Sequence, residues 1–318
     1  MKSATNIPRK IAGFDIPSFD FPGLDLAGLE KADINIDRVR NWLGDQLRTR
    51  VVGDNADQRA TELFDAPGPR WFGPDEPIRI VHSDASMFIG GLRALLLQSL
   101  HPLAMAGVAT HSDYRADPWG RLQRTSDFLA ATTFGPAAEA ERAVEIVHRV
   151  HERVTGVASD GRPYAANDPH LLRWVHVAEV DSFLTAFNRH GAQKLSPEMQ
   201  DRYVANTAVI ARALGSETPP ESVAELREQL QAFRPELRGT PEAREGAQYL
   251  LLKAPLPPAG LAVYGLLAGA AVALLPVWAR LPLRLPFLPL TEAFALRPAG
   301  EALTRTLRWA MAPQSRFT

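Results

Sequence analysis

Apolar positions along this chain recur at helical rather than strand spacing. Ser86 to Gly107 is almost entirely apolar, as expected of a long buried helix. Apolar residues then keep a spacing of three to four from Leu122 to about Thr133, where Gly135-Pro136 marks a helix stop. No stretch of any length alternates apolar and polar residues with the period of two that marks a half-buried strand. The pattern therefore predicts an all-α protein.

The same spacing predicts further helices towards the C-terminus, separated by Gly and Pro. Ser196-Pro197 is a helix start, with Ser196 as the N-cap and Pro197 at the first helical position. The predicted helices cover residues 137–155, 170–189, a stretch from Pro197, a stretch from about Glu221, and 303–311. Before them, residues 75–83 (DEPIRIVHS) form the approach to the first core helix.

The N-terminal sequence has a different character. Residues 1 to about 35 hold single apolar residues between scattered Pro, Gly and Asp, and residues 37–49 favour a short helix. We therefore expect residues 1–60 to form an irregular N-terminal arm with a short helix. Residues 61–318 are expected to form a single large multi-helix globular domain, which is within the size range of one core.

Residues 254–279 carry no charge. Their uninterrupted part is long enough to span a bilayer, which takes about 20 apolar residues. Many Ala and Gly residues lower its hydrophobicity, however, and Pro257-Pro258 and Pro276 bracket it. We expect a buried helix or one in peripheral contact with a membrane, with a true span as the alternative. The Pro-rich text after it, residues 281–290 (LPLRLPFLPL), predicts a packed irregular segment.

Composition excludes several classes of partner and of metal site. A net charge of −1 gives no basic surface for nucleic acid. The absence of cysteine excludes disulfides, iron–sulfur clusters and thiol catalysis, so a metal would need His, carboxylate, Tyr or Met ligands. The N-terminus lacks the apolar core of a signal peptide, and a cytoplasmic location is expected.

His148 and His151 lie on one predicted helix. At about 100° per residue, His151 shares a stripe with Val144, Val147 and Val154, while His148 lies at the edge of that stripe. His151 therefore points into the core. A buried imidazole needs a partner for each nitrogen. A metal ion is one such partner, and a backbone carbonyl or a neighbouring side chain is the other.

Arg121 and Thr125 are four residues apart and share a helix face. An Arg directed inward needs an anionic partner, which could be a bound anionic group or an ordinary acid such as Asp117 or Asp127. His101, His111 and His176 are further candidates, although each taken singly is also typical of a hydrogen-bonded core or loop residue. Pro102 disfavours α geometry at His101.

Taken in order, these pieces resemble the family of latex-clearing proteins (rubber oxygenases) and MpaB-type oxygenases. The resemblance covers residues 80–215. Its motifs are Gln98-Ser-Leu-His101-Pro, His111-Ser, Asp117-Pro-x-Gly-Arg121-x-x-x-Thr125, Phe134-Gly135, His148-x-x-His151-x-x-Val154-x-Gly156, Asp168-Pro and Trp174-Val-His176. No single motif is specific, but the ordered set is.

The resemblance implies a helical fold that binds a b-type haem, with His151 as the iron ligand and His148 as its supporting neighbour. Arg121 and Thr125 match the Arg and Thr beside the haem, and His101, His111 and His176 are candidates for the other side of the pocket. The implied reaction is O₂-dependent cleavage of an isoprenoid carbon–carbon double bond. Neutral His ligation and an apolar pocket agree with the general rule that the ligand and the pocket set haem chemistry.

One position departs from the rubber-cleaving pattern. Where those enzymes carry Lys before the Thr, this chain has Arg124, and its text LHPLAMAGV supplies no acid. Arg cannot lose its proton to act as a ligand or base. A small or isoprenoid-tailed lipid is therefore expected rather than polyisoprene, and a peroxidase-like reaction stays open. The alternative class is a non-catalytic helical protein that binds haem or lipid at a membrane through residues 254–279.

Overall fold

The computed structural model describes residues 63–64, 66–112, 115–256 and 258–311, without the side chains of residues 258 and 259, together with two short N-terminal strands. The chain divides into two units, residues 1–39 and 40–318. In the first unit, β1 (Lys10–Ile11) pairs antiparallel with β2 (Phe14–Asp15). The rest of the expected arm, including the predicted helix at residues 37–49, lies outside the described residues.

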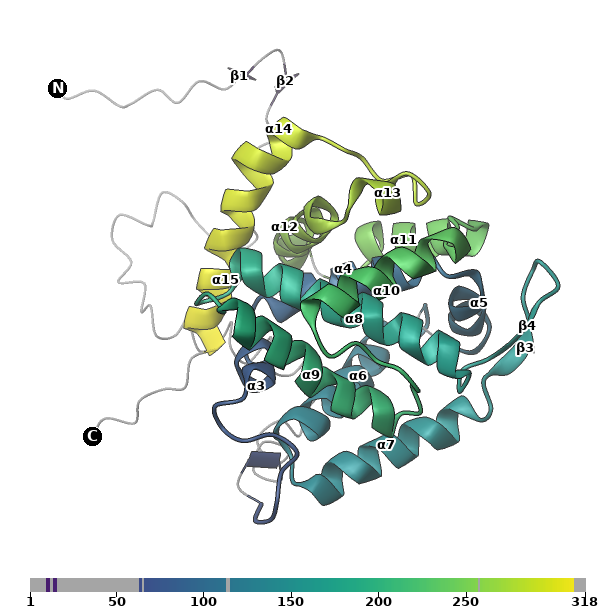
Figure 1. Cartoon of the computed structure of the whole chain (residues 1–318). Helices are drawn as coiled ribbons and strands as arrows, with labels where there is room; N and C mark the ends of the chain where they lie inside the picture. The colour runs from purple at the N-terminus through teal and green to yellow at the C-terminus, as the bar shows by residue number, and fades with distance from the viewer. Residues whose placement is uncertain are drawn as a thin grey trace, which may run out of the picture. The chain divides into compact units, whose positions relative to one another are not determined.

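The second unit is helical, as the sequence predicts (Figure 1). Its elements, in chain order, are α3 (Pro77–His82), α4 (Met87–Gln98), α5 (Pro102–His111), α6 (Pro118–Phe134), α7 (Ala137–His151), β3 (Thr155–Val157), β4 (Pro163–Ala165), α8 (Pro169–His190), α9 (Pro197–Ala213), α10 (Val223–Phe233), η1 (Arg234–Glu236), α11 (Pro241–Leu252), α12 (Pro258–Leu274), α13 (Val277–Arg280), α14 (Pro289–Thr291), the π-helix η2 (Glu292–Leu296) and α15 (Arg297–Met311).

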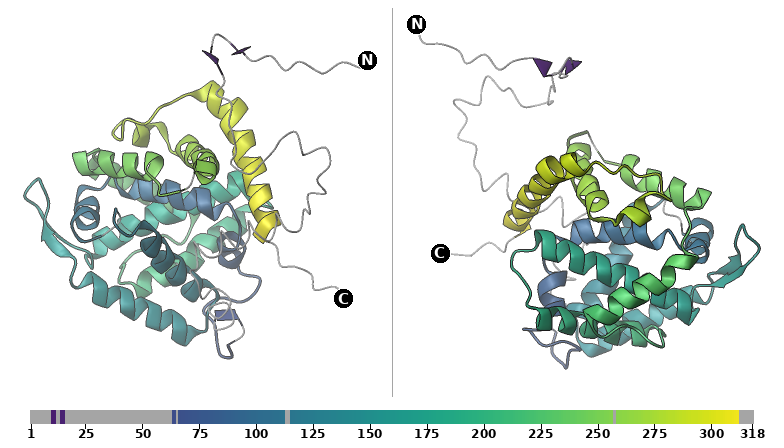
Figure 2. Two further views of the ribbon diagram at one scale, coloured as in Figure 1. Left: turned by 180° about the vertical axis from the view of Figure 1, so that it is seen from behind. Right: turned by 45° about the horizontal axis from the view of Figure 1, so that its top comes forward.

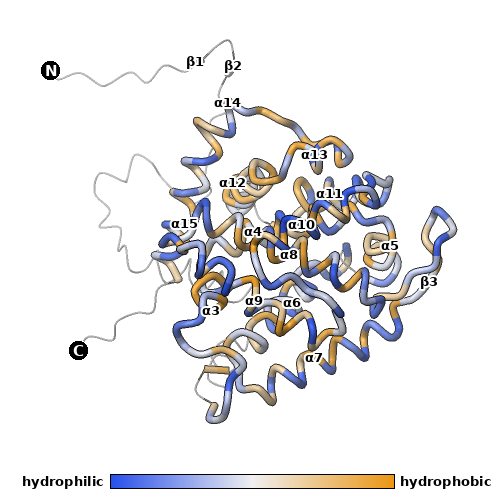
Figure 3. The backbone as a smooth tube through the Cα atoms, viewed as in Figure 1, coloured by the Kyte–Doolittle hydropathy of each residue, from blue (hydrophilic) through white to orange (hydrophobic). Residues whose placement is uncertain are grey.

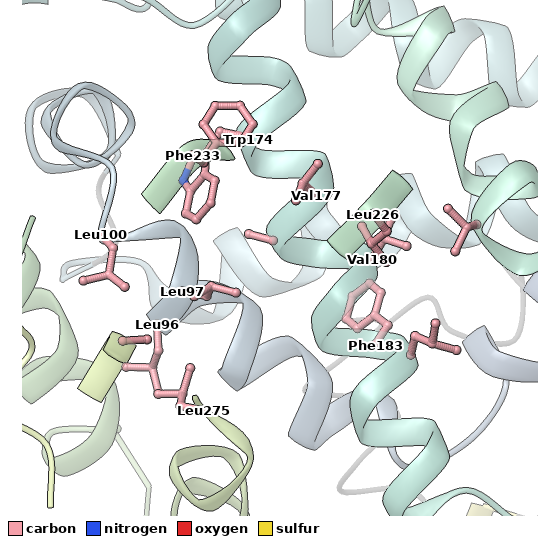
Figure 4. Packing of buried hydrophobic residues seen from close by; sticks show 14 of the residues in the cluster. Leu96, Leu97, Leu100, Trp174, Val177, Val180, Phe183, Leu226, Phe233 and Leu275 are labelled. Atoms are coloured by element: carbon pink, nitrogen blue, oxygen red, sulfur yellow. The ribbon is translucent and has the colours of Figure 1, made fainter. Parts of the chain in front are cut away.

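The core is built around α8, with α4 packed along it. Trp174, Val177, Val180 and Phe183 project from α8 into one cluster of buried side chains (Figure 4). The two helices approach closely at Gly90, where a Cβ atom would lie 2.8 Å from Cδ1 of Phe183. The missing side chain at this position therefore permits close packing of α4 on α8.

The expected continuous helix from Ser86 to Gly107 is wrong. It is two helices, α4 and α5, bent by 107° around His101-Pro102. His101 is extended (φ −84°, ψ 116°), as the residue before Pro is expected to be, and its Nδ1 accepts a weak hydrogen bond from the amide of Ala104. His101 is therefore the N-cap of α5.

The helix predicted for residues 137–155 is also shorter than expected, since α7 ends at His151. The next residues pair as the hairpin β3–β4, with Gly156 opposite Tyr164 and a turn at Gly161 (φ +84°). The hairpin projects from one side of the helical unit (Figure 2). A Cβ at Gly156 would lie 2.6 Å from the Tyr164 hydroxyl, so this close pairing depends on glycine.

The uncharged stretch 254–279 does not form one helix. α12 ends at Leu274, and Pro276 precedes the separate short helix α13. Within the described residues, no single helix is long and apolar enough to cross a membrane; only the bent pair α4 and α5 meets these criteria together. Residues 281–288 are irregular, as expected, and α14 begins at Pro289. The chain between α13 and α14 is mostly hydrophobic (Figure 3). The packing expected for it is found only in part, because Leu283 is buried in the core while Leu281, Phe287 and Leu290 are exposed.

Candidate functional site

The ends of α7, α8 and α9 meet around His148. Its Nε2 lies 3.0 Å from the carbonyl oxygen of Ala213, the last residue of α9, and must donate because a carbonyl only accepts. Gly215 follows with φ +94°, and a Cβ there would lie 3.8 Å from Cε1 of His148 and 3.6 Å from Cδ1 of Leu172 on α8. The hydrogen bond fixes the His148 ring, and the glycine at position 215 leaves room beside it.

His151, one turn along α7, lacks such a partner. Its Nδ1 is buried and has no hydrogen bond within the described residues, and neither does the buried Oδ1 of Asn167. Burial and the neighbouring His148 lower the pKa of His151, while Asn167 is close enough to raise it in part. Asn167 is itself held, because its Nδ2 donates to the backbone oxygen of His148 at 3.4 Å. Burial therefore favours the neutral form of His151, whose Nδ1 faces Asn167 without a formed hydrogen bond.

His176 on α8 faces the same end of α9. The charge of Arg212, beside Ala213, acts on it, and burial as the main cause lowers the pKa of His176 to about 4. Its Nε2 is buried with no partner in the described part of the chain. The side chain nevertheless keeps an intermediate exposed fraction. His176 is therefore a neutral imidazole with one nitrogen unpaired among the described residues.

Glu179 lies one turn further along the same face of α8. Burial raises the pKa of its carboxyl to about 7, and no hydrogen bond to it is present among the described residues. Like His176, it keeps an intermediate exposed fraction. Its charge also acts on Tyr203 of α9, whose pKa burial raises well above its usual value. An acid that is half protonated near neutral pH thus faces inward beside His176.

Tyr203 belongs to a line of hydrogen-bonded polar side chains in the core. Its hydroxyl lies 3.3 Å from Nε2 of His82, and Nδ1 of His82 lies 2.8 Å from the hydroxyl of Thr133. Burial lowers the pKa of His82 to about 3, so the ring is neutral and one nitrogen donates while the other accepts. This line joins α3, α6 and α9 and ends beside Glu179.

The polar residues of α6 lie at its first two turns. Nη1 of Arg121 donates to the hydroxyl of Ser112 at 2.8 Å, and the hydroxyl of Thr125 donates to the Arg121 carbonyl. Arg124 donates to Asp117 at 3.2 Å, and both of these side chains are exposed. Arg124 therefore forms an Arg–Asp pair at the start of α6. Thr125 is exposed as well.

A cluster that the sequence analysis missed joins His101 to His170 and Glu236. Nε2 of His170 lies 2.8 Å from Oε2 of Glu236, and Nε2 of buried His101 lies 3.3 Å from the same oxygen. Two imidazoles and a carboxylate, whose ligand atoms lie within 4.8 Å of one another, could hold a metal ion.

The outer nitrogens of this cluster argue for hydrogen bonding instead. Arg173 donates to Nδ1 of His170 at 3.2 Å, and the Ala104 amide donates to Nδ1 of His101. Both rings then carry their proton on Nε2, which donates to Glu236. A metal-ligating imidazole shows the reverse, with its outer N–H donating to an acceptor. Burial lowers the pKa of His101, which also favours its neutral form.

The eight residues singled out by sequence thus fall into four places. His148 and His176 lie at the end of α9, His151 lies beside His148 and Asn167, and Arg121, Arg124 and Thr125 lie on α6. His101 belongs to the Glu236 cluster, while His111 is exposed and its Nε2 donates to the carbonyl of Thr155 at 3.1 Å.

Sequence reasoning also missed Glu179, although one signal could have found it. The residue is a carboxylate inside the apolar helical text VHVAEVDSF, three residues after His176. Spacing of three places the two side chains on one helix face. By contrast, Glu236 is distant along the chain from His101 and His170, so only the fold brings these three together.

Comparison with known proteins agrees with this architecture. The family model described as "ER-bound oxygenase mpaB/B'/Rubber oxygenase, catalytic domain" matches residues 78–309, which includes α3 to α9 and the histidines of the site. No curated protein and no solved structure matches the chain. The chain therefore belongs to the mpaB/rubber oxygenase catalytic-domain family and is an oxidoreductase of the oxygenase type.

Proposed function

We propose that this oxygenase works with a b-type haem, held through His151, and acts on an apolar alkene of the isoprenoid or lipid type. The observation that carries the proposal is the buried Nδ1 of His151, which has no hydrogen-bond partner among the described residues, on the last turn of α7 beside Asn167. A neutral imidazole nitrogen is the usual protein ligand of haem iron.

The residues around His151 fit this role. The two buried atoms without partners, Nδ1 of His151 and Oδ1 of Asn167, belong to neighbouring side chains and complement one another. A small rotation of either side chain lets Nδ1–H donate to Oδ1, which leaves Nε2 free to bind iron. An outer hydrogen bond of this kind orients a ligating imidazole and raises its basicity. His148, already bound to the Ala213 carbonyl, is the support of the turn rather than the ligand.

Haem iron, when bound, supplies O₂ activation. The other sides of the pocket are proposed to come from apolar side chains of α5 and α6 that pack partly buried against the core, among them Ala104, Val108 and Phe128. These side chains exclude water from an alkene. His176 and Glu179 supply polar groups that accept or donate a proton at Nε2 and at the carboxyl. Arg121 and Thr125 are proposed to bind the haem carboxylates.

The reaction proposed is cleavage of a carbon–carbon double bond. One O₂ adds to the alkene, both oxygen atoms end in two carbonyl products, and no external reductant is required. Arg124 lies on the exposed side of α6, bound to Asp117, and a guanidinium cannot serve as a base. The text LHPLAMAGV supplies no acid, unlike the rubber-cleaving pattern. We propose that the carboxyl of Glu179 takes the role of that missing acid.

The experiment is a turnover assay on the full chain reconstituted with haem, using an isoprenoid alkene under ¹⁸O₂. Incorporation of one labelled oxygen into each carbonyl product supports cleavage by a single O₂. Label from water, or turnover only with added hydrogen peroxide, would replace this mechanism with a peroxidase-like one. Haem or lipid binding without any oxygen uptake would favour the non-catalytic alternative, which the family assignment makes the weaker candidate.

A further inference from the structure

An exposed apolar segment runs from α13 to η2. We call residues 277–296 the apolar strap. Six large apolar side chains of the strap are exposed: Val277, Leu281, Phe287, Leu288, Leu290 and Phe294. Leu281, Leu290 and Phe294 have exposed fractions of 71%, 74% and 81%. Single exposed apolar residues are ordinary on protein surfaces, but six within one short segment mark an interaction surface.

The strap is held from beneath by a buried ion pair. Nη1 of Arg280 donates to Oε1 of Glu292 at 2.5 Å, and the same oxygen accepts the amide of Leu288. The other nitrogens of Arg280 donate to the carbonyls of Leu275 and Ala273 at 2.8 and 2.9 Å. Every interior polar group of the pair therefore has partners. The fold fixes this segment in place and still leaves its apolar side chains outside.

The backbone between the two partners is specifically shaped. Arg284 has φ +57°, a left-handed conformation that residues other than glycine rarely adopt. Arg244 of α11 donates to the carbonyl of Pro282 at 2.9 Å, and the guanidinium of Arg280 lies 5.3 Å from the ring centre of Phe287. These contacts hold the strap in one defined conformation.

Within residues 253–297, the exposed charges are of one sign. Between Lys253 and Arg297 the only acid is Glu292, which is buried and paired with Arg280. Lys253, Arg284 and Arg297 are exposed, and none of them forms an ion pair within the described residues. From the elements below, Arg234 packs on Trp278 at 5.1 Å and Arg244 reaches Pro282. The exposed charges of this segment, Lys253, Arg284 and Arg297, are therefore basic, and we call them the basic rim.

We infer that the apolar strap docks on an anionic lipid bilayer, with Phe287, Leu290 and Phe294 entering the interface and the basic rim contacting lipid phosphates. Apolar side chains combined with basic residues are the chemistry that binds the interfacial region of an anionic membrane. A second copy of this chain is a poorer partner, because a twofold interface would gather the basic residues of both copies, and residues 253–297 offer them no exposed acid. This contact lies at residues 277–296 rather than along residues 254–279, and it does not depend on haem.

The test is co-sedimentation of the full chain with vesicles of phosphatidylcholine alone and of phosphatidylcholine with phosphatidylserine. The wild type should sediment with the anionic vesicles and much less with the neutral ones. Phe287→Ser with Leu290→Ser should weaken vesicle binding by about tenfold or more, since two large apolar side chains are lost. Arg284→Glu with Arg297→Glu should remove the preference for anionic vesicles.

A matched control is available on α7, where Ile146 and Val150 are exposed apolar residues outside the strap. Ile146→Ser with Val150→Ser should leave sedimentation unchanged, and circular dichroism should show that all variants fold. The inference is overturned if the wild type does not sediment with either vesicle, or if the strap variants and the α7 control behave alike. Concentration-dependent dimerisation that the strap variant abolishes, without vesicle binding, would assign the surface to a second copy instead.

Discussion

The carbonyl oxygen of Ala213 accepts a hydrogen bond from Nε2 of His148 at 3.0 Å, which ties the end of α9 to the last turn of α7. We predict that His148→Ala lowers the free energy of unfolding by about 1–2 kcal/mol, since a partly buried hydrogen bond and its packing are lost. Haem binding should survive. Urea denaturation measures the first effect and absorption spectroscopy the second; loss of haem with unchanged stability would make His148 the ligand.

Glu179 gives the stability of the protein a pH dependence of known sign. Burial raises the pKa of its carboxyl from 4.5 to about 7 in the folded state, so folding favours the protonated form. The contribution of Glu179 to the free energy of unfolding is complete below pH 4.5 and is lost as pH rises towards 7. Glu179→Gln should therefore be more stable than wild type above pH 7, by at most about 3 kcal/mol, with the difference growing between pH 4.5 and 7.

The measurement is urea denaturation of the two proteins across pH 4 to 8. The exposed Glu228→Gln on α10 serves as the matched control and should show no such trend. A difference between Glu179→Gln and wild type that does not change with pH would show that the carboxyl is not desolvated in the folded protein.

Two desolvated histidines make the free energy of unfolding depend on pH in the opposite direction. Burial lowers the pKa of His82 to about 3 and that of His176 to about 4, so both are neutral when folded. Their contribution is complete above pH 6.5 and is lost as pH falls towards these values. We expect the wild-type protein to lose stability between pH 6.5 and 4, and His176→Phe should lose less. An identical acid dependence in wild type and variant would contradict the neutral, buried state of His176.

The buried pair of Arg280 and Glu292 should be costly to break from one side. Arg280→Met or Glu292→Leu alone is expected to destabilise the fold by about 3–5 kcal/mol, because the remaining charge stays buried without its partner. The double variant should recover most of this loss. Thermal denaturation of the four proteins forms a double-mutant cycle, and strictly additive effects would mean that the two residues do not interact.

The cluster of His101, His170 and Glu236 should behave as a set of structural hydrogen bonds rather than as a metal site. Glu236→Gln is expected to lower the free energy of unfolding by about 1–3 kcal/mol through loss of a charged acceptor for two imidazoles. Added Zn²⁺ should leave the melting temperature unchanged, because both outer nitrogens accept hydrogen bonds. A rise in melting temperature with Zn²⁺ that disappears in Glu236→Gln would identify a metal site.

Helical periodicity predicts the fold well where one side of a helix is apolar. The stop at Gly135 and the N-cap at Ser196 are confirmed, since α6 ends at Phe134 and Ser196 accepts from the Met199 amide at 3.3 Å. Periodicity alone could not show the bend at His101, because the apolar text continues through it. The local effect of Pro102 on the preceding residue determines that bend.

Local helix geometry likewise accounts for only part of the candidate site. The spacing of His148 and His151 places both on the last turn of α7, which local geometry decides. The role of Ala213 as acceptor for His148, and the position of Glu179 opposite Tyr203, depend on contacts between helices distant in sequence. The same is true of the strap, which was expected to be packed: Leu283 is buried, but Leu281, Phe287, Leu290 and Phe294 lie outside, above the buried Arg280–Glu292 pair.

The central claim is that His151 is the iron ligand. Its most direct test is the absorption spectrum of wild type, His151→Ala and His148→Ala, each purified after expression with a haem precursor. The account predicts a Soret band in wild type and in His148→Ala, and its loss or a clear shift in His151→Ala while far-ultraviolet circular dichroism is unchanged. A folded wild type without a Soret band, or an unaltered band in His151→Ala, would contradict it.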